Sequence, residues 1–119
     1  MAAKTRMLFF YQDGCHWCVQ MDEILHEPEV SGLLLRHTQI IRVDVHGRNK
    51  VAALGKTGIS LTKEFKVYGT PTIILLGDGG KVLLRIPGVL TRKDFLDVIC
   101  HYIPGMQKKK DCVERVSAL

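Results

Sequence analysis

The stretch DGCHWCVQM, residues 13–21, places Cys15 and Cys18 three positions apart, with His16 and Trp17 between them. A pair at this spacing can form half of a metal site, a local disulfide, or a dithiol that exchanges electrons with other thiols. The segments on either side of the pair distinguish among these three uses, and they also indicate the fold.

The chain around this pair is predicted to alternate strands and helices. Bulky apolar runs of strand length alternate with amphipathic segments, and glycine or proline stands at the junctions. The predicted elements are a strand over residues 6–12, helices from residues 16 and 28, strands over 39–45, 70–76 and 81–87, and a helix after Thr91. The first strand, helix and strand form a βαβ unit with parallel strands, and GDGG at 77–80 predicts an antiparallel hairpin. The predicted class is therefore α/β, with a mixed sheet covered by helices.

Two segments have less regular patterns. Residues 46–60 are rich in Gly and Lys and are expected to form an exposed loop or an irregular hairpin. Residues 60–69 are expected to form one or two helical turns, with Ser60 as the cap and Gly69 at the end. The helix after Thr91 is expected to bury one stripe of side chains, namely Phe95, Leu96, Ile99, Tyr102 and Ile103.

Length and charge exclude several classes of protein. The 119 residues, 46% of them hydrophobic, suffice for one domain with its own core. No apolar run is long enough to cross a bilayer, and MAAKTRMLFF at residues 1–10 lacks the apolar core of a signal peptide. The formal net charge of +5 has no groove-reading motif beside it, so we expect a solubilising basic face rather than nucleic-acid binding.

A redox dithiol fits the cysteine pair better than the other two uses. A structural zinc site usually needs four ligands, and no second pair or spaced set of histidines accompanies Cys15 and Cys18. A disulfide across so short a loop restrains the unfolded chain little. Cys15, by contrast, should lie at the start of a helix, where free N–H groups and the helix dipole favour a thiolate. Cys18, one turn into the helix, should be more buried and suits the attack that resolves a mixed disulfide.

The neighbours of the pair each have two interpretations. A protonated His16 would stabilise the thiolate, or His16 is a solvated loop residue. Trp17 either shields the sulfurs and offers a face to a partner, or packs internally. Pro71 begins a strand, and trans is the default for its peptide bond, whereas a cis bond would present the Thr70 backbone to an extended peptide.

The motifs together resemble the thioredoxin superfamily over about residues 5–104. They are CHWC after a strand, YGTPT at 68–72, GDGGKVLLRIPG at 77–88 and a closing helix. The closer resemblance is to extracytoplasmic thioredoxins of the SoxW type and to the C-terminal thioredoxin-like domain of DsbD, on the approach Tyr11, Asp13, Cys15. This resemblance implies a thioredoxin fold, with a four- to five-stranded mixed sheet and helices on both faces. The domain would span residues 1–104, and residues 105–119 would form a basic tail of uncertain order.

The resemblance also implies roles for single residues. Cys15 would be the nucleophile and Cys18 the resolving cysteine, with Pro71 as a cis-proline facing them. Thr70 would precede that proline in the substrate-binding segment, and Gly88 would let a partner approach. The implied reaction is reversible thiol–disulfide exchange with protein substrates and an upstream redox donor, with no metal and no organic cofactor.

The chain departs from ordinary thioredoxins at two places. Gly-Cys-His-Trp-Cys stands where they have Trp-Cys-Gly-Pro-Cys, so their reduction potential does not carry over. Phe9 stands where they bury the aspartate that accepts the proton of the second cysteine. Asp22 follows Cys18 by four residues on the same helix face and is expected to take that role. Asp13 is the second candidate, and the alternative is that Asp22 is merely solvated.

The leading interpretation is a monomeric reductant of protein disulfides. The alternatives are a disulfide oxidase or isomerase, or a redox-silent thioredoxin-fold module that binds peptides. The family resemblance points to the periplasm or another extracytoplasmic site, with the cytoplasm as the alternative. Of the remaining cysteines, Cys100 is expected to be a half-buried thiol and Cys112 to be exposed in the tail. In an oxidising compartment Cys112 could pair with Cys100 or cross-link two chains.

Overall fold

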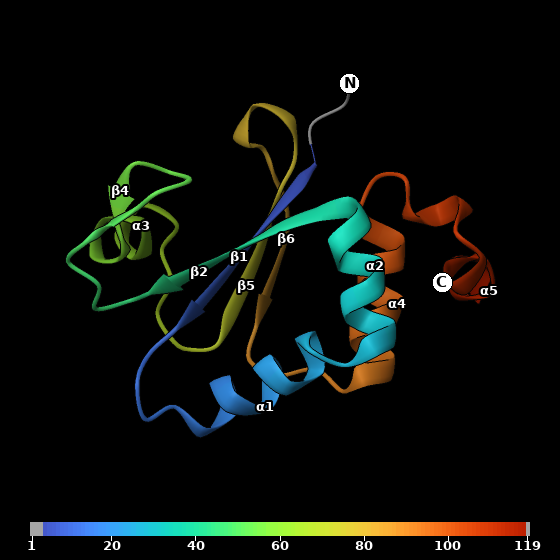
Figure 1. Cartoon of the computed structure of the whole chain (residues 1–119), viewed down its shortest axis with the longest axis horizontal. Coiled ribbons are helices and arrows are strands. Elements are labelled where there is room, and N and C mark those ends of the chain that lie inside the picture. The colour runs from blue at the N-terminus through green and yellow to red at the C-terminus, as the bar shows by residue number, and fades with distance from the viewer. Residues whose placement is uncertain (1–3, 119) are drawn as a thin grey trace.

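The computed structural model describes residues 4–118 (Figure 1). Its strands are β1 (Thr5–Tyr11), β2 (Thr38–Asp44), β3 (Lys50–Val51), β4 (Lys56–Thr57), β5 (Thr72–Leu76) and β6 (Val82–Pro87). Its helices are α1 (His16–Leu25), α2 (Pro28–His37), α3 (Gly58–Glu64), α4 (Arg92–Tyr102) and α5 (Lys110–Ala118), with short 3-10 turns η1 (Asp78–Gly80) and η2 (Met106–Lys108). Every strand and helix predicted from the sequence is present, with small shifts at the ends.

The central sheet has four strands in the order β2-β1-β5-β6. β1 and β2 are parallel along their whole length, from the pair Thr5 and Thr38 to the pair Tyr11 and Asp44. β5 runs antiparallel to β1, and β6 runs antiparallel to β5. The mixed sheet and its βαβ unit are therefore confirmed. Residues 46–57 add a small separate hairpin, β3–β4, rather than a fifth strand of the main sheet.

Strand β1 is buried on both faces, which explains its continuous run of large apolar residues. Met7 and Phe9 pack in the core formed with α1, α2 and α4. Leu8 and Phe10 pack on the opposite side, in the core formed with α3. Figure 1 shows α2 and α4 beyond one face of the sheet and α3, with the β3–β4 hairpin, beyond the other. Each such buried side chain contributes roughly 1.5–3 kcal/mol through the hydrophobic effect.

The helix ends agree with the sequence signals in three cases and differ in two. Cys15 is the N-cap of α1, Pro28 occupies the first turn of α2, and the Thr91 hydroxyl accepts a 3.1 Å hydrogen bond from the Asp94 N–H. Both predicted ends of α3 were wrong, since the helix ends at Glu64 rather than at Gly69 and Ser60 is not its cap. Thr57 caps this helix, because its hydroxyl oxygen accepts the N–H of Ser60 at 3.1 Å.

The apolar stripe of α4 differs from the prediction at two positions. Phe95, Leu96, Ile99 and Ile103 are buried as expected. Tyr102, however, is 43% exposed, while the neighbouring Cys100 is fully buried. The stripe is rotated in this way because α5 packs over the Cys100 side of the helix.

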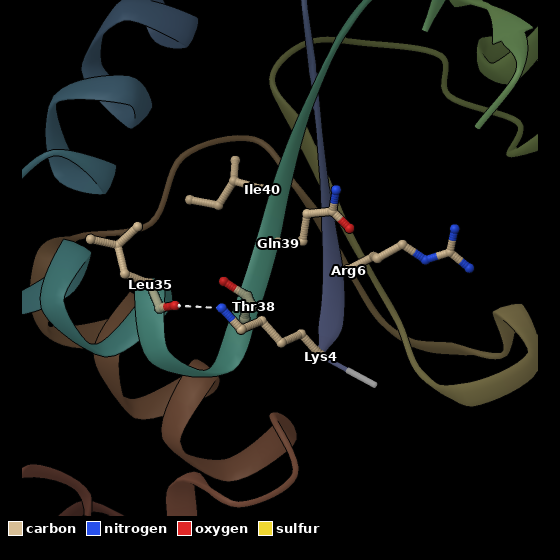
Figure 2. A pocket seen from close by; sticks show the side chains of 6 residues that line it. All are labelled: Lys4, Arg6, Leu35, Thr38, Gln39 and Ile40. Carbon is tan, nitrogen blue, oxygen red and sulfur yellow. Dashed lines mark hydrogen bonds between the residues drawn. The ribbon is translucent and has the colours of Figure 1, made fainter. Parts of the chain in front are cut away.

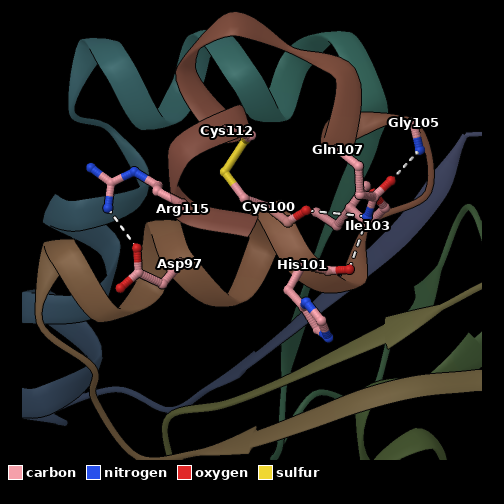
Figure 3. Close-up of a disulfide and its surroundings, with 8 residues drawn as sticks. All are labelled: Asp97, Cys100, His101, Ile103, Gly105, Gln107, Cys112 and Arg115. Carbon is pink, nitrogen blue, oxygen red and sulfur yellow. Dashed lines mark hydrogen bonds and ion pairs between the residues drawn. A yellow bond between two sulfur atoms is a disulfide. The ribbon is translucent and has the colours of Figure 1, made fainter. Parts of the chain in front are cut away.

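The segment after residue 104 is helical and packs on α4. A disulfide joins Cys100 to Cys112, and both side chains are fully buried (Figure 3). The expectations of a half-buried Cys100 thiol and an exposed Cys112 are therefore wrong, and the pairing weighed as one alternative is the one observed. Met106 adds a further buried contact, and Arg115 of α5 makes an ion pair with Asp97 of α4 at 2.7 Å. Within residues 4–118, none of the helices combines the length and apolarity that a bilayer-spanning segment requires.

Candidate active site

Cys15 and Cys18 lie at the start of α1 and are joined as a disulfide. Cys15 is the N-cap residue, and its sulfur accepts a 3.1 Å hydrogen bond from the backbone N–H of Cys18. Cys15 is half-buried, whereas Cys18 is only 5% exposed. Because a helix N-terminus stabilises negative charge, the local geometry favours a thiolate at Cys15 once the disulfide is reduced.

The segment before β5 lies beside the cysteine pair, because β5 is the neighbour of β1 in the sheet. The Thr70 hydroxyl donates to the Cys15 sulfur at 3.4 Å, although 55 residues separate them. The Thr70–Pro71 peptide bond is cis, whereas the default expected from the residues was trans. The Gly88 N–H donates to the Pro71 carbonyl at 2.8 Å. Three segments that are distant in the sequence are therefore neighbours at one end of the sheet.

Gly88 follows β6 directly and leaves open space beside Pro71. Its φ is +83°, a conformation that side-chain-bearing residues rarely adopt. A Cβ at this position would have no heavy atom within 4 Å. The backbone is thus accessible here to an approaching chain.

His16 and Trp17 form an exposed rim at the first turn of α1. Trp17 is 57% exposed, and its ring lies 5.2 Å from the His16 ring in an edge-to-face arrangement. Val19, two residues further, is 59% exposed. The interpretation of Trp17 as an internal packing residue is therefore wrong, and its apolar surface is available to a partner.

A hollow of about 630 Å³ opens on the α1 side of the cysteines. Both sulfur-bearing residues line it, together with Phe9, Asp22 and Arg42. Asp22, the expected proton acceptor, thus lines the same hollow as Cys18. Asp13 also lines it and is exposed.

Arg42 of β2 neutralises Asp22 within this hollow. Its Nη2 atom lies 2.5 Å from Oδ1 of Asp22, and its guanidinium lies 5.4 Å from the centre of the Phe9 ring. Oδ1 is shielded from solvent and takes part in an ion pair rather than a well-oriented hydrogen bond. Any proton that Asp22 accepts must therefore go to Oδ2 or displace Arg42.

A second hollow, of about 520 Å³, opens on the Pro71 side. We call it the β6 groove, and its lining residues are Lys66, Tyr68, Gly69, Thr70, Pro71, Thr72, Arg85, Pro87 and Gly88. Tyr68 is 91% exposed, and Lys66 and Arg85 give the groove two positive charges. Arg85 also donates to the carbonyl oxygens of Phe65 and Lys66, which holds its guanidinium at the groove wall.

The structure adds three residues that the sequence analysis missed. They are Arg42, Gln12 and His46. Gln12 and His46 extend the hydrogen-bonded chain that begins with Cys15 and Thr70. The Gln12 side-chain N–H donates to the Thr70 hydroxyl oxygen at 2.9 Å, and the Gln12 carbonyl oxygen lies 3.0 Å from Nε2 of His46. Only the position of Gln12, just before the cysteine pair, could have pointed to one of them.

A third hollow lies at the opposite end of β1 (Figure 2). It measures about 780 Å³, and Lys4 at its rim donates to the Leu35 carbonyl at 3.1 Å. None of its six lining residues carries a thiol or an imidazole, so we place the chemistry at the cysteine end. Among residues 4–118, no group of three His, Cys, Asp or Glu side chains is placed to hold a metal ion.

The mixed sheet, the N-capping cysteine pair and the facing Thr70–Pro71 segment define a thioredoxin fold. A family model described as a thioredoxin-like domain matches residues 2–103, and the chain belongs to that family. Two curated relatives are 31% identical over 96 residues, and each is named Thiol:disulfide interchange protein DsbD, from two strains of Campylobacter jejuni. The match covers 81% of this chain and 16% of each relative, so the chain spans a small part of their length.

Solved structures show the same fold. A thioredoxin-fold protein from Helicobacter pylori superposes with a TM-score of 0.72 at 24% identity, covering 97% of this chain and 81% of that one. A thioredoxin from Thermus thermophilus superposes with a TM-score of 0.67 at 27% identity, covering 81% of this chain and 71% of that one. The alignment with the Helicobacter pylori protein includes nearly the whole of the present chain.

Proposed function

We propose that the protein is a thiol–disulfide oxidoreductase that passes electrons from its Cys15–Cys18 dithiol to disulfides of other proteins. This proposal rests mainly on two hydrogen-bond donors that lie beside the same sulfur atom. The Cys18 N–H and the Thr70 O–H both point at Sγ of Cys15, at 3.1 Å and 3.4 Å. Donors to a thiolate lower its basicity and raise its population, which is what a nucleophilic cysteine requires.

The reaction proceeds in two exchanges. The Cys15 thiolate attacks one sulfur of a client disulfide, forms a mixed disulfide and releases the other client sulfur as a thiolate. Cys18 then loses its proton, with Asp22 as the proposed acceptor, and attacks the Cys15 sulfur. This attack releases the second client thiolate and leaves a Cys15–Cys18 disulfide, so two electrons have passed to the client. An upstream dithiol donor restores the reduced pair.

The client segment would lie along the Pro71 side of the cysteines. Thr70 and Pro71 directly precede β5 beside Cys15, and Gly88 leaves room next to them. Trp17 and His16 would contact the same segment from the α1 side, because both are exposed beside Cys15. The protein would act as a single chain on protein clients, without a metal or an organic cofactor.

An extracytoplasmic location, such as the periplasm, is part of this proposal. The relatives named DsbD are similar to this chain, and a role like that of SoxW-type thioredoxins would fit. The buried Cys100–Cys112 disulfide supports it, because structural disulfides persist in oxidising compartments. The cytoplasm remains the alternative.

The proposed activity is tested by the reduction of insulin disulfides in the presence of dithiothreitol. We expect the wild-type protein to accelerate insulin precipitation and Cys15→Ser to abolish the effect. Cys18→Ser should instead trap a mixed disulfide that a non-reducing gel detects. His101→Leu, on the distant exposed side of α4, is the matched control and should keep full activity. A wild-type protein without activity would favour the alternative of a redox-silent peptide-binding module.

One observation favours an oxidase or isomerase as the second candidate. Both donors to Cys15 stabilise the thiolate and therefore the reduced form of the pair, and a stabilised reduced form makes a couple more oxidising. The potential can be measured in glutathione buffers through the fluorescence of Trp17, the only tryptophan. A potential at the reducing end of the thioredoxin-fold range supports the reductant, and one at the oxidising end supports the oxidase.

A further inference from the structure

A chain of three hydrogen-bond contacts leads from the Cys15 sulfur to a histidine on another loop. The Thr70 hydroxyl donates to Sγ of Cys15 at 3.4 Å, and Nε2 of Gln12 donates to the Thr70 oxygen at 2.9 Å. Nε2 of His46 lies 3.0 Å from Oε1 of Gln12. Cys15, Thr70 and Gln12 are half-buried, whereas His46 is exposed at the outer end.

The direction of each bond follows from the number of protons available. The Thr70 hydroxyl carries one proton, and using it on Cys15 leaves only its lone pairs for Gln12. Gln12 must therefore turn its NH₂ toward Thr70 and its oxygen toward His46. That oxygen only accepts, so Nε2 of His46 must carry a proton and donate it. The three orientations are mutually consistent: a proton on Nε2 of His46 favours this orientation of the amide, and the amide favours this orientation of the hydroxyl.

Hydrogen bonds to the backbone restrain the loop that carries His46, although the His46 side chain is exposed. The His46 backbone N–H donates to Oδ1 of Asp44 at 2.9 Å, and the Ile59 N–H donates to the Gly47 carbonyl at 3.0 Å. A Cβ on Gly58 would lie 1.9 Å from the Asp44 carbonyl oxygen, so only glycine allows α3 to approach this closely. The imidazole is therefore presented to Gln12 from a fixed backbone.

We propose that His46 and Gln12 are positioning residues that direct the Thr70 hydroxyl proton to the Cys15 sulfur and thereby stabilise its thiolate. This inference rests on the proposed function and deepens it. Without the His46 donor, the Gln12 amide is free to reverse and to accept the Thr70 proton instead. The hydroxyl then turns its lone pairs toward Cys15, and the thiolate loses one of its two donors.

The first test measures the ionisation of Cys15 in a Cys18→Ser background, where Cys15 is the only unpaired thiol. The rate of alkylation by iodoacetamide is measured across the pH range in which thiols titrate. The pH dependence of the rate gives the fraction of thiolate, and the plateau at high pH gives the reactivity of the thiolate itself. We expect His46→Leu to lower the thiolate-to-thiol ratio about fivefold, as the loss of one net hydrogen bond implies, because the Gln12 amide can then reverse and accept the Thr70 proton. His46→Gln keeps a donor at the position of Nε2 and should restore the wild-type ratio.

The second test measures the equilibrium of the intact Cys15–Cys18 pair with glutathione. Losing a donor to the thiolate destabilises the reduced form, so the oxidised-to-reduced ratio at a given glutathione mixture should rise about fivefold in His46→Leu. His101→Leu is the matched control, since it removes an exposed imidazole outside the chain of contacts. Thermal unfolding of each variant checks that the fold is retained.

The inference is overturned if His46→Leu titrates and equilibrates like the wild type, or if His46→Gln fails to keep the wild-type values. Neither measurement needs a client protein. Insulin reduction tests the proposed function and the ionisation of Cys15 tests the positioning role, so the failure of one is distinguishable from the failure of the other.

Discussion

The Asp22 carboxylate and the Arg42 guanidinium form an ion pair in the hollow that Cys18 lines, with Oδ1 and Nη2 2.5 Å apart. Asp22 comes from α1 and Arg42 from β2, and the Arg42 side chain also covers the ring of Phe9. Phe9 occupies the position where ordinary thioredoxins bury a carboxylate. A carboxylate supplied by the helix therefore lies in the hollow that Cys18 lines, and an arginine neutralises it.

If Asp22 accepts the Cys18 proton, Asp22→Asn slows the second exchange. We expect the rate at which Cys18 resolves a mixed disulfide to fall about tenfold, less than the usual loss of a general base, because a thiol ionises in part near neutral pH. Rapid-mixing kinetics on a preformed mixed disulfide at Cys15 measure this step. Glu23→Gln, the exposed neighbour on α1, is the control. An unchanged rate in Asp22→Asn would contradict this role and leave the carboxylate its contacts with Arg42 and His26.

The positive charge of the β6 groove predicts a preference among client peptides. A disulfide peptide with glutamate beside its cysteine should react with a kcat/KM a few-fold higher than one with lysine, in keeping with the ~0.2–1 kcal/mol of exposed ion pairs. Lys66→Glu should reverse the order, and added salt should weaken it. Lys81→Glu changes the same charge outside the groove and should leave the preference intact. Equal rates for both peptides in the wild type would contradict the prediction.

The Cys100–Cys112 disulfide is expected to stabilise the fold without serving the reaction. It closes a loop of sequence separation 12 between α4 and α5. Replacing both cysteines with alanine should lower the free energy of unfolding by about 3 kcal/mol, mainly because the unfolded chain gains freedom. Urea denaturation measures the loss, and insulin reduction should stay at the wild-type level. A large fall in activity at full folding would show that α5 affects the cysteine site.

The ion pair between α4 and α5 predicts a dependence of stability on pH. The hydrogen bond from Arg115, aided by Lys93, holds the pKa of Asp97 below its ordinary value, although burial acts in the opposite direction. A lowered folded pKa contributes stability that is present above the ordinary carboxyl pKa and is lost as the pH falls through the folded one. Asp97→Asn should therefore lower Tm at neutral pH.

The same comparison in acid supplies the check on this prediction. Below both pKa values the Asp97 carboxyl is protonated in the folded and the unfolded state, so the Tm difference between wild type and Asp97→Asn should vanish. Glu114→Gln, an exposed neighbour of Arg115 on α5, should show no such pH-dependent difference. A Tm gap that persists in acid would mean that Asp97 acts through packing rather than charge.

Local signals in the sequence were strong enough to predict most of the fold. The apolar run before Cys15, the proline at the start of α2, the Thr91 cap and the GDGG turn act over a few residues, so their effects can be read one at a time. The prediction erred where a distant element decides. Cys100 rather than Tyr102 faces inward, because α5 covers that side of α4. The error at Ser60 is of another kind, since Thr57, three residues earlier, caps α3.

Some features of the candidate site could likewise be predicted from the sequence, and others could not. The sequence by itself predicted the cysteine pair at a helix start and the position of Asp22 one turn after Cys18, and only the family resemblance implied that Thr70 and Pro71 face the pair. Only the tertiary structure decided that Arg42 neutralises Asp22 and that Gln12 and His46 line up behind Thr70. Those contacts join β1, β2 and their loops across tens of residues, and their formation depends on sheet register and on the close approach at Gly58. The residues around Cys15 are distant in the sequence and close in space, and no local sequence pattern encodes that proximity.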